Sequence, residues 1–370
     1  MIAPAPLAEI EKALNAKVIN IERVTKIYGS DADSFLIKVV SAKNKITMYF
    51  LKFEEKNRTN QEIAGIRFIE KFLPTPKIIV TSRGKSLSPG WILFEHVQGK
   101  LMAEKYLKIK DENEFESFCK LEQRKEKLLG VLYSQPTIKM SYNDYIKLPA
   151  NQLFRERLCG KRYGEFFGNK QGNVSQYFDR RISINKCNFP STVNQIFESI
   201  RKKYSSRKHE LVTALMGQGD AHHGNIIVNK GIEFIDNEYA GFMPPFMELA
   251  KPYYNDFIGT LFFHHHQTLE QHFQIRSFKD TGTKLLFEIK SPQKITRPIK
   301  ITQIKLFERK KWVNEATDDF LSLNDYLVLS HALTKNPNTY PPKTKLLFLT
   351  FVAILAQFDP LDPESLYRLF

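Results

Sequence analysis

The fold of this 370-residue chain is restricted most strongly by a hairpin pattern within residues 217–241. Two short apolar runs occur there, at 226–228 and 232–235, and the turn residues Asn229-Lys230-Gly231 separate them. Two apolar runs around an Asn- and Gly-containing turn are typical of a tight β-hairpin. We therefore predict an antiparallel strand pair in this part of the chain.

Polar side chains stand at both outer ends of this hairpin. Asp220 and Asn225 precede the first run, and Asp236 follows the second. Pairing of the strands is expected to bring two carboxylates and an amide oxygen together. Such a cluster suits phosphoryl transfer, because one carboxylate can accept the proton of the attacking hydroxyl while the other oxygens hold Mg²⁺ against nucleotide phosphates.

The same residue types also occur in turns that have no catalytic role. Asp and Asn beside Gly are common turn formers, and Asp-x-Glu after a strand is often a solvated loop. Here both halves of the cluster occur in the right order, with a hairpin of suitable length between them. This combination favours a kinase over an ordinary loop.

The segment resembles the catalytic loop of the aminoglycoside phosphotransferase and choline kinase-like family, a relative of the protein kinases. The family's loop reads His-Gly-Asp-x-His-x-x-Asn. This chain has Gln218 in place of the first histidine and matches the loop at Gly219, Asp220, His222 and Asn225.

A second segment of the family reads Ile-Asp-Phe/Trp-Glu-Tyr-Ala-Gly. Residues 235–241 match it, with Asn237 in place of the aromatic residue. The resemblance implies a role for each matched polar side chain: a catalytic base at Asp220, Mg²⁺ ligands at Asn225 and Asp236, and a further or indirect metal ligand at Glu238.

The sequence before the hairpin predicts a small β-rich lobe. Alternating apolar and polar residues indicate strands at 18–27, 34–40 and 46–53, and two shorter strands at 78–81 and 91–94.

The turn-like residues 28–33 separate the first two of these strands and include Gly29 and Ser30. A kinase-type nucleotide loop is built in this way, with backbone N–H groups over the phosphates. An ordinary hairpin would give the same pattern, because one glycine is fewer than the protein-kinase loop contains.

Lys52 lies in the third strand, and Glu62 follows it by ten residues. In kinase-like folds the lysine of this strand contacts the α- and β-phosphates and pairs with a glutamate of the next helix, so the resemblance implies these roles here. Two alternatives stay open. Lys38 is a rival lysine in the preceding strand, and Glu62 could simply cap a helix that opens with the capping-box pattern Thr59-Asn-Gln-Glu62.

The composition changes after Glu95, where β-rich sequence gives way to helical sequence rich in Lys, Glu and Leu. This change predicts a nucleotide-binding lobe at residues 1–97 and a helical catalytic lobe at 98–370. The predicted fold class is α+β, a bilobal protein-kinase-like fold with a small β-rich N-lobe and a large, mostly helical C-lobe. Glu95 and Val97 are assigned, by position alone, to the connecting segment that holds adenine in such folds.

The second lobe is predicted to contain helices near 111–134, 141–158 and 191–204. Between the last two, residues 160–183 alternate basic and aromatic side chains, and we favour aromatics that pack inward over a phosphate-binding surface. The apolar run at 346–358 is shorter than the roughly 20 residues that span a bilayer and predicts a buried helix.

A basic β-hairpin is predicted near 285–308, with strands at 285–290 and 299–307. The net charge of +15 favours anionic partners, and nucleic acid or another polyanion would bind at this hairpin if the chain holds one. A solvated hairpin without a partner is the alternative. The same charge disfavours a polycationic aminoglycoside substrate.

Other metal and redox patterns are weak. The consecutive histidines His264–His266 cannot all face one ion from a helix. Three widely spaced cysteines indicate a reducing compartment. We therefore expect a cytoplasmic protein with no signal peptide and no membrane span.

The function predicted is ATP-dependent transfer of the γ-phosphate to a hydroxyl of a small molecule, anionic or neutral, with Mg²⁺ as cofactor. A kinase acting on RNA or protein is the main alternative, supported by the basic hairpin and the net charge. A non-catalytic nucleotide-binding protein is the third, for which Gln218 and Asn237 are the only arguments.

Overall fold

The computed structural model describes residues 4–24, 33–82, 90–168, 172–206, 210–290, 295–315 and 319–369. Gly29 and Ser30, in the predicted nucleotide loop, lie outside these residues.

The chain divides into two compact units. The N-terminal unit comprises Met1–Lys108 and Gly224–Ala240, and the C-terminal unit comprises Ile109–His223 and Gly241–Phe370. The central hairpin thus belongs to the N-terminal unit, whereas a single break at residues 97–98 would have assigned it to the second lobe.

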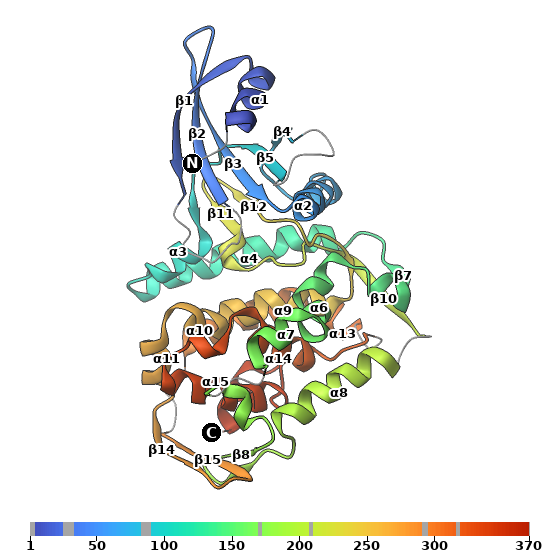
Figure 1. Ribbon diagram of the computed structural model, residues 1–370, viewed down its shortest axis with the longest axis vertical. Helices are drawn as coiled ribbons and strands as arrows, with labels where there is room; N and C mark the ends of the chain where they lie inside the picture. Colours follow the sequence, from blue (N-terminus) through green and yellow to red (C-terminus); the bar gives the residue numbers. More distant parts are fainter. Residues whose placement is uncertain are drawn as a thin grey trace. The chain divides into compact units, whose positions relative to one another are not determined.

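The N-terminal unit contains an antiparallel sheet of five strands in the order β1-β2-β3-β5-β4 (Figure 1). The five predicted strands are all present. They are β1 (Ala16–Arg23), β2 (Asp33–Ser41), β3 (Ile46–Glu54), β4 (Ile78–Thr81) and β5 (Gly90–Glu95).

Helices α1 (Pro4–Leu14) and α2 (Lys56–Ile69) contribute to two separate hydrophobic cores of this unit. Successive side chains of a strand point to opposite faces of a sheet. Accordingly, Trp91 and Leu93 of β5 pack in a cluster with Ile10 of α1, while Ile92 packs in a second cluster with Ile66 of α2. Burial on both faces fixes the register of β5 and of its neighbour β3.

The predicted central hairpin is confirmed. Strand β11 (Ile226–Val228) pairs antiparallel with β12 (Ile232–Phe234), and Asn229, Lys230 and Gly231 form the turn. On its other edge, β11 pairs with β6 (Lys100–Leu101), which leads into α3 (Met102–Leu107).

The C-terminal unit is mainly helical. Its α-helices are α4 (Glu112–Tyr133), α5 (Tyr142–Tyr145), α6 (Arg155–Cys159), α7 (Lys161–Phe167), α8 (Val193–Ser206), α9 (Pro245–Tyr254), α10 (Thr260–His264), α11 (His266–His272), α12 (Thr296–Glu308), α13 (Lys310–Glu315), α14 (Leu323–Thr334) and α15 (Pro342–Leu355). A π-helical segment, Asn255–Gly259, joins α9 to α10. Short 3₁₀ segments lie at Pro149–Leu153, Val174–Tyr177, Pro337–Thr339 and Pro363–Leu369, and another, His223–Asn225, runs across the division between the units.

Two small sheets complete this unit. One has the order β13-β10-β7, and the other has the order β14-β15-β8-β9. Their strands are β7 (Ile138–Ser141), β8 (Arg181–Ile184), β9 (Cys187–Asn188), β10 (Leu211–Gly217), β13 (Gly241–Met243), β14 (Ile275–Asp280) and β15 (Lys284–Ile289).

The predicted helices at 111–134 and 191–204 are confirmed as α4 and α8, but the helix predicted at 141–158 is wrong. That stretch holds the short helix α5, a 3₁₀ turn beginning at Pro149, and α6. Proline lacks a backbone N–H and disfavours helix at the residue before it, which explains the interruption.

The strand predicted at 299–307 is also wrong, because these residues belong to α12. The hairpin is instead β14–β15, at residues 275–289. Ile299 and Ile301 alternate as in a strand, but the buried face of the helix is completed by Thr302 and Lys305. These two are polar residues, so a pattern of apolar positions could not reveal that face.

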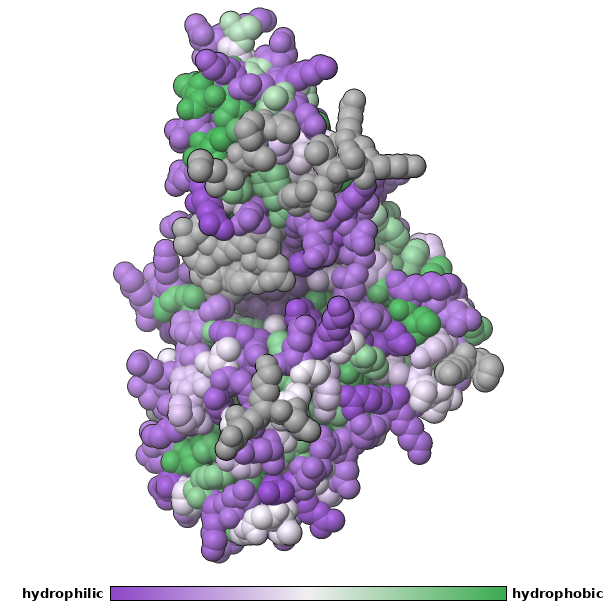
Figure 2. All heavy atoms as spheres, viewed as in Figure 1, coloured by the Kyte–Doolittle hydropathy of each residue, from purple (hydrophilic) through white to green (hydrophobic). Residues whose placement is uncertain are grey.

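The apolar C-terminal run is a buried helix, as predicted. Residues Leu347–Leu355 of α15 are all buried, and α14 packs against this helix. The face drawn in Figure 2 is, in contrast, mostly hydrophilic. Within the described parts of the chain, the helices are all too short or too polar to cross a membrane.

Candidate active site

A buried lysine lies among three carboxylates in the N-terminal unit. Lys52 Nζ, from β3, is 2.6 Å from Glu62 Oε2 of α2 and 2.7 Å from Asp236 Oδ1, just after β12. Glu54 Oε1 is 3.1 Å from the same nitrogen. The structure therefore confirms the pairing of Lys52 with Glu62 and adds two acidic neighbours.

The charged groups in this cluster shift one another's pKa values. Burial opposes the charge of Lys52, but Asp236, Glu62 and Glu54 outweigh it and hold the pKa of the lysine well above its usual value. Burial also raises the pKa of Glu62 to about 7, although Lys52 acts in the opposite direction. Lys52 is thus protonated, and its single positive charge faces three carboxyl groups.

The two alternatives for this pair are resolved. Lys38 is exposed on β2, so it does not compete with Lys52. The capping-box prediction is wrong, because α2 begins at Lys56 with Glu55 as its N-cap. Thr59 therefore lies inside the helix, and its hydroxyl donates to the carbonyl oxygen of Glu55 at 3.2 Å.

Asp236 adopts an unusual backbone conformation. Its φ is +58°, in the left-handed region that non-glycine residues seldom occupy. The side chain of the next residue, Asn237, is buried and donates from Nδ2 to the carbonyl oxygen of Phe234 at 3.1 Å. Asn237, which stands where the family that the sequence resembles has an aromatic ring, thus stabilises the turn that orients Asp236.

The turn after Asp236 also packs closely against α2. A Cβ atom added at Gly65 would lie 1.9 Å from the carbonyl oxygen of Asn237, which is far inside van der Waals contact. Only glycine at this helix position permits the approach. Gly65 therefore helps to fix Asp236 beside Lys52.

Glu238 binds an arginine in this structure. Its two carboxylate oxygens accept from Arg58 Nε at 2.9 Å and Arg58 Nη2 at 2.5 Å, and the glutamate is buried. Bidentate pairing of this kind is strong and geometrically specific. The contact joins the turn after β12 to the first part of α2, which is a different arrangement from direct metal ligation.

Asn225 is buried at the start of β11. Its carbonyl oxygen accepts from the backbone N–H of Ile235 at 3.0 Å, so the residue lies next to the strand end that leads into Asp236. The hairpin thus brings Asn225 and the Asp236 segment together, as predicted, whereas the approach of Asp220, which belongs to the C-terminal unit, stays a prediction.

Beside Lys52, the site offers oxygens of the kind that bind a hard cation such as Mg²⁺. One carboxylate oxygen from each of Glu54, Glu62 and Asp236 lies within 4.8 Å of the other two. Lys52 Nζ already contacts all three carboxylates, however, so a metal would bind at the edge of this group. Asp236 exposes 30% of its side chain, and Glu54 Oε2 is buried without a hydrogen-bond partner among the described residues. Carboxylate and amide oxygens are the ligands that Mg²⁺ prefers.

The two residues assigned to the adenine-binding segment lie at the end of β5 and just after it. The backbone N–H of Glu95 donates to the carbonyl oxygen of Lys77 at 2.9 Å, and its exposed side chain accepts from the backbone N–H of Lys77 at 2.9 Å. Val97 is half-buried in the segment that leads to β6. Their contact with a nucleotide base stays a prediction.

In the C-terminal unit, the loop that carries Asp220 is held by one buried glutamate. Glu248, on α9, accepts from the backbone N–H of Gly219 at 2.6 Å and that of Gln218 at 3.3 Å. Its Oε1 also accepts from the Tyr133 hydroxyl at 2.8 Å. The structural role expected for Glu248 is to anchor this loop.

Gln218 performs a second anchoring role. Its buried Oε1 accepts from the backbone N–H of Asp220 at 2.8 Å. Gly219 has a φ of +87°, a conformation that glycine adopts without strain. The glutamine that replaces the family's histidine therefore holds the loop rather than disrupting it.

The remaining loop residues lie next to a buried network of charges. His222 Nε2 is 3.7 Å from Asp220 Oδ2, and His223 Nε2 is 2.7 Å from Glu122 Oε2 of α4. The backbone N–H of His223 donates to Asp256 Oδ1 at 3.0 Å. The loop is thus fixed on both sides of Asp220.

Comparison with known proteins shows similarity in structure only. No family model matches the sequence, and no curated protein matches it. Crystal structures of a thermostable mutant of aminoglycoside phosphotransferase APH(4)-Ia are similar over almost the whole chain. The complex with AMP-PNP and hygromycin B gives a TM-score of 0.51 at 10% identity and covers 99% of each chain. The complex with ADP and hygromycin B gives 0.51 at 9% identity and covers 98% of each chain.

The chain has the fold of the aminoglycoside phosphotransferases. This bilobal, protein-kinase-like α+β fold is the class that the sequence predicted.

Several residues of this candidate site were not predicted. Glu54 and Arg58 are surrounded by other charged residues in the sequence, and nothing local marks them as buried. The burial of Glu54 follows from the alternation of β3, since it lies two positions after Lys52 and on the same face of the strand. Arg58 is revealed only by its contact with Glu238, which is 180 residues away.

In the described part of the chain near 285–308, Lys290 and Lys300 are exposed, but two other basic residues do not reach solvent. Lys305 and Arg309 are buried and pair with Glu122 and Glu126 of α4, respectively. Their charges are therefore neutralised inside the unit, so they do not contribute to a polyanion-binding surface.

Two aromatic residues of the 160–183 stretch pack inward, as favoured, and Tyr163, Phe166 and Tyr177 are half-buried. Phe167 and Phe178 are buried, and their ring centroids are 4.9 Å apart.

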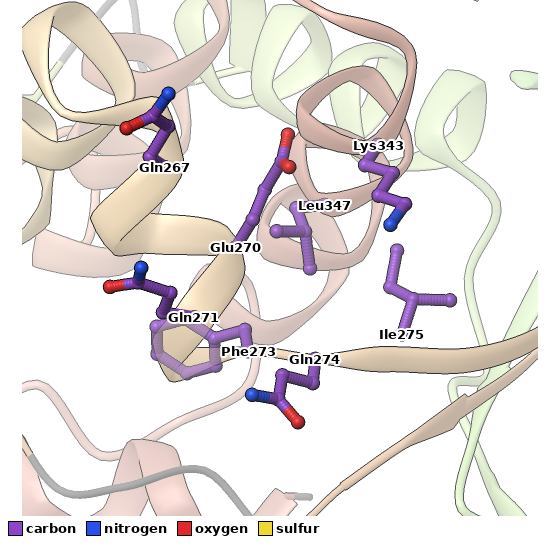
Figure 3. Close-up of a pocket in the computed structure, with 8 residues that line it drawn as sticks. All are labelled: Gln267, Glu270, Gln271, Phe273, Gln274, Ile275, Lys343 and Leu347. Atoms are coloured by element: carbon purple, nitrogen blue, oxygen red, sulfur yellow. The ribbon is translucent and has the colours of Figure 1, made fainter.

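A cavity of about 470 Å³ lies between α11, the start of β14 and α15 (Figure 3). Its wall includes Gln267, Glu270 and Gln271 from α11 and Lys343 from α15. Glu270 Oε1 accepts from the hydroxyl of Thr344 at 2.7 Å. None of the predicted site residues lines this cavity, so the candidate active site rests on the residues described above.

Proposed function

We propose that the protein is an ATP-dependent phosphotransferase that moves the γ-phosphate to a hydroxyl of a small molecule. The observation that carries this proposal is the position of Lys52, which lies within 2.7 Å of both Glu62 and Asp236. A lysine paired with a helix glutamate and placed beside a metal-binding aspartate is the arrangement that steadies nucleotide phosphates in kinases.

In this proposal the N-terminal unit binds ATP. Lys52 contacts the α- and β-phosphates, and Glu62 fixes the direction of its ammonium group. The segment with Glu95 and Val97 holds the adenine. A nucleotide bound in this way presents its γ-phosphate for transfer.

Asn225 and Asp236 would hold Mg²⁺, which neutralises charge on the phosphate oxygens when it is bound. We do not include Glu238 as a ligand, because both of its oxygens already accept from Arg58. Its proposed role is to fix the turn that carries Asp236.

Asp220 is the proposed catalytic base. It accepts the proton of the acceptor hydroxyl while the hydroxyl oxygen forms a bond to the γ-phosphorus. The bond from the γ-phosphorus to the β,γ-bridging oxygen breaks, and ADP leaves with that oxygen. Glu248 and Gln218 act as positioning residues, because they hold the backbone around Asp220.

The acceptor is proposed to be a neutral or anionic small molecule, and the protein is proposed to act in the cytoplasm. A net charge of +15 repels polycations such as aminoglycosides. A kinase acting on RNA or protein is less favoured, because Lys305 and Arg309, two of the basic residues near the predicted hairpin, are buried in ion pairs.

The test is a single-turnover screen with γ-labelled ATP and Mg²⁺. One pool of acceptors contains neutral and anionic metabolite hydroxyls, and the other contains total tRNA and protein extract. We expect label in the metabolite pool that is lost in the Asp220→Asn variant. Measurable binding of Mg·ATP without transfer to either pool would contradict the proposal and favour a non-catalytic nucleotide-binding protein.

A further inference from the structure

Three basic side chains converge on the C-terminal end of α14, in the same unit as Asp220. Arg157 of α6 and Lys251 of α9 both donate to the hydroxyl of Thr334, at 3.3 Å and 2.9 Å. Arg162 of α7 donates to the carbonyl oxygen of Leu333 at 3.4 Å. Arg157 and Lys251 lie close together because they share the Thr334 hydroxyl. Arg162 contacts the residue before it, Leu333.

The three cations differ in exposure. Lys251 is only 3% exposed, whereas Arg157 and Arg162 are half-buried and reach solvent. A ligand could therefore meet the two guanidinium groups first and the ammonium group at greater depth. Arginine suits such a position, because its planar fork matches the oxygens of a phosphate or carboxylate.

The end of α14 offers these three cations a weak negative charge. The C-terminus of a helix carries a partial negative charge equivalent to about half an electron. Burial and the neighbouring Arg157 lower the pKa of Lys251 to about 7, Arg162 adds to this effect, and Asp220 opposes it. A bound anion would therefore favour the charged form of Lys251.

The position of Asp220 connects this cluster with the proposed chemistry. Asp220 is the acidic residue whose charge favours protonation of Lys251, so the cluster lies within electrostatic range of the proposed base. An acceptor bound here by one end could therefore present a hydroxyl to Asp220 at its other end.

We propose that Arg157, Arg162 and Lys251 form a binding site for a phosphate group of the acceptor substrate. Three positive charges match a dianionic phosphate monoester better than a single carboxylate. The acceptor class is then a phosphorylated hydroxy compound. The role of this site in selecting the acceptor rests on the proposed phosphotransfer. Its ability to bind phosphate does not depend on that function.

The test is calorimetric titration of the full chain with inorganic phosphate while saturating Mg·AMP-PNP occupies the nucleotide site. We expect one phosphate per chain. Lys251→Met and Arg162→Gln should each weaken binding about tenfold or more, as expected for loss of a hydrogen bond between charged groups. Lys161→Gln, which removes an exposed charge from the same helix as Arg162, should leave the affinity unchanged.

Proton uptake gives a readout that a purely structural cluster would not show. Lys251 faces Arg157 on α6, Arg162 on α7 and Asp220 in the loop after β10. A bound phosphate dianion raises the proton affinity of Lys251, so binding at pH 8 should take up a proton. Titrations in two buffers of different ionisation enthalpy measure this uptake, and Lys251→Met should abolish it.

The outcomes separate the two proposals. Phosphate binding with equal affinity in wild type, Lys251→Met and Arg162→Gln would overturn the phosphate site, as would the absence of binding or equally tight binding of acetate. Phosphate binding that depends on these residues, in a chain that does not bind Mg·AMP-PNP, would retain the site and contradict the proposed phosphotransfer. Unchanged circular dichroism of the variants shows that they are folded.

Discussion

Lys52 Nζ lies 2.7 Å from Asp236 Oδ1, although 184 residues separate these two side chains in the sequence. The contact joins β3 to the turn that follows the central hairpin. It places the cation proposed to bind phosphate beside the carboxylate proposed to bind metal. The N-terminal unit therefore contributes both a proposed phosphate-binding residue and a proposed metal ligand to the nucleotide site.

The first prediction concerns the removal of this cation. Lys52→Met leaves Glu54, Glu62 and Asp236 close together without a positive charge, which should cost about 3–5 kcal/mol of unfolding free energy. Denaturant unfolding measures the loss, and Lys38→Met, an exposed lysine on the neighbouring strand, is the control. Equal stability of the two variants would contradict the buried ion-pair network. Mg·ATP affinity should fall only in Lys52→Met.

The second prediction tests the packing of the Asp236 turn on α2. Gly65→Ala places a methyl group 1.9 Å from the carbonyl oxygen of Asn237, so the backbone must shift. We expect a loss of about 1–3 kcal/mol in unfolding free energy. The matched control is Gly164→Ala in α7, where an added Cβ has no atom within 4 Å. Helix propensity alone should make this control neutral or slightly stabilising.

The third prediction concerns the anchor of the Asp220 loop. Glu248→Ala leaves the N–H groups of Gly219 and Gln218 without their buried acceptor, which costs about 1–3 kcal/mol for each unsatisfied group. Because the loop loses its position, the transfer rate should fall at least tenfold while Mg·ATP affinity stays the same. Tyr133→Phe removes one of the bonds to Glu248 and should have a smaller effect. An equal loss in both variants would contradict the anchoring role.

The fourth prediction is a pH dependence of stability. Lys251 has its pKa lowered to about 7 in the folded state, from a usual value of 10.5. Between these values the unfolded chain binds more protons, so the wild type gains stability as pH rises, at up to about 1.4 kcal/mol per pH unit.

Lys251→Met removes this dependence. Its gain in stability over wild type should be largest at and below pH 7 and should decrease toward pH 10. Melting temperatures across this range provide the measurement. A constant difference between the two proteins at all pH values would show that Lys251 does not titrate in this way.

Much of the fold follows from local patterns in the sequence. Alternating side chains predicted the strands of the N-terminal sheet, and the Asn-Lys-Gly turn predicted the central hairpin. Both are local signals, set by residues that are close together in the chain. The pairing of Lys52 with Glu62 could be predicted because the third strand and the helix after it follow each other in the order expected for a kinase-like fold.

The parts that were missed depend on contacts between distant residues. Lys305 completes the buried face of α12 because Glu122 neutralises it, and a lysine carries no sequence signal for burial. Arg58 likewise pairs with Glu238 across 180 residues. The convergence of Arg157, Arg162 and Lys251 depends on the packing of helices that the sequence does not specify.

The single-turnover rate of γ-phosphate transfer tests the role of Asp220 most directly when it is measured for wild type and Asp220→Asn with an acceptor identified in the screen. We expect a rate about 10²- to 10⁴-fold lower in Asp220→Asn, with unchanged Mg·ATP affinity, because only the proton acceptor is lost. Transfer that requires Mg²⁺ but proceeds equally fast in Asp220→Asn would contradict the assignment of Asp220 as the base.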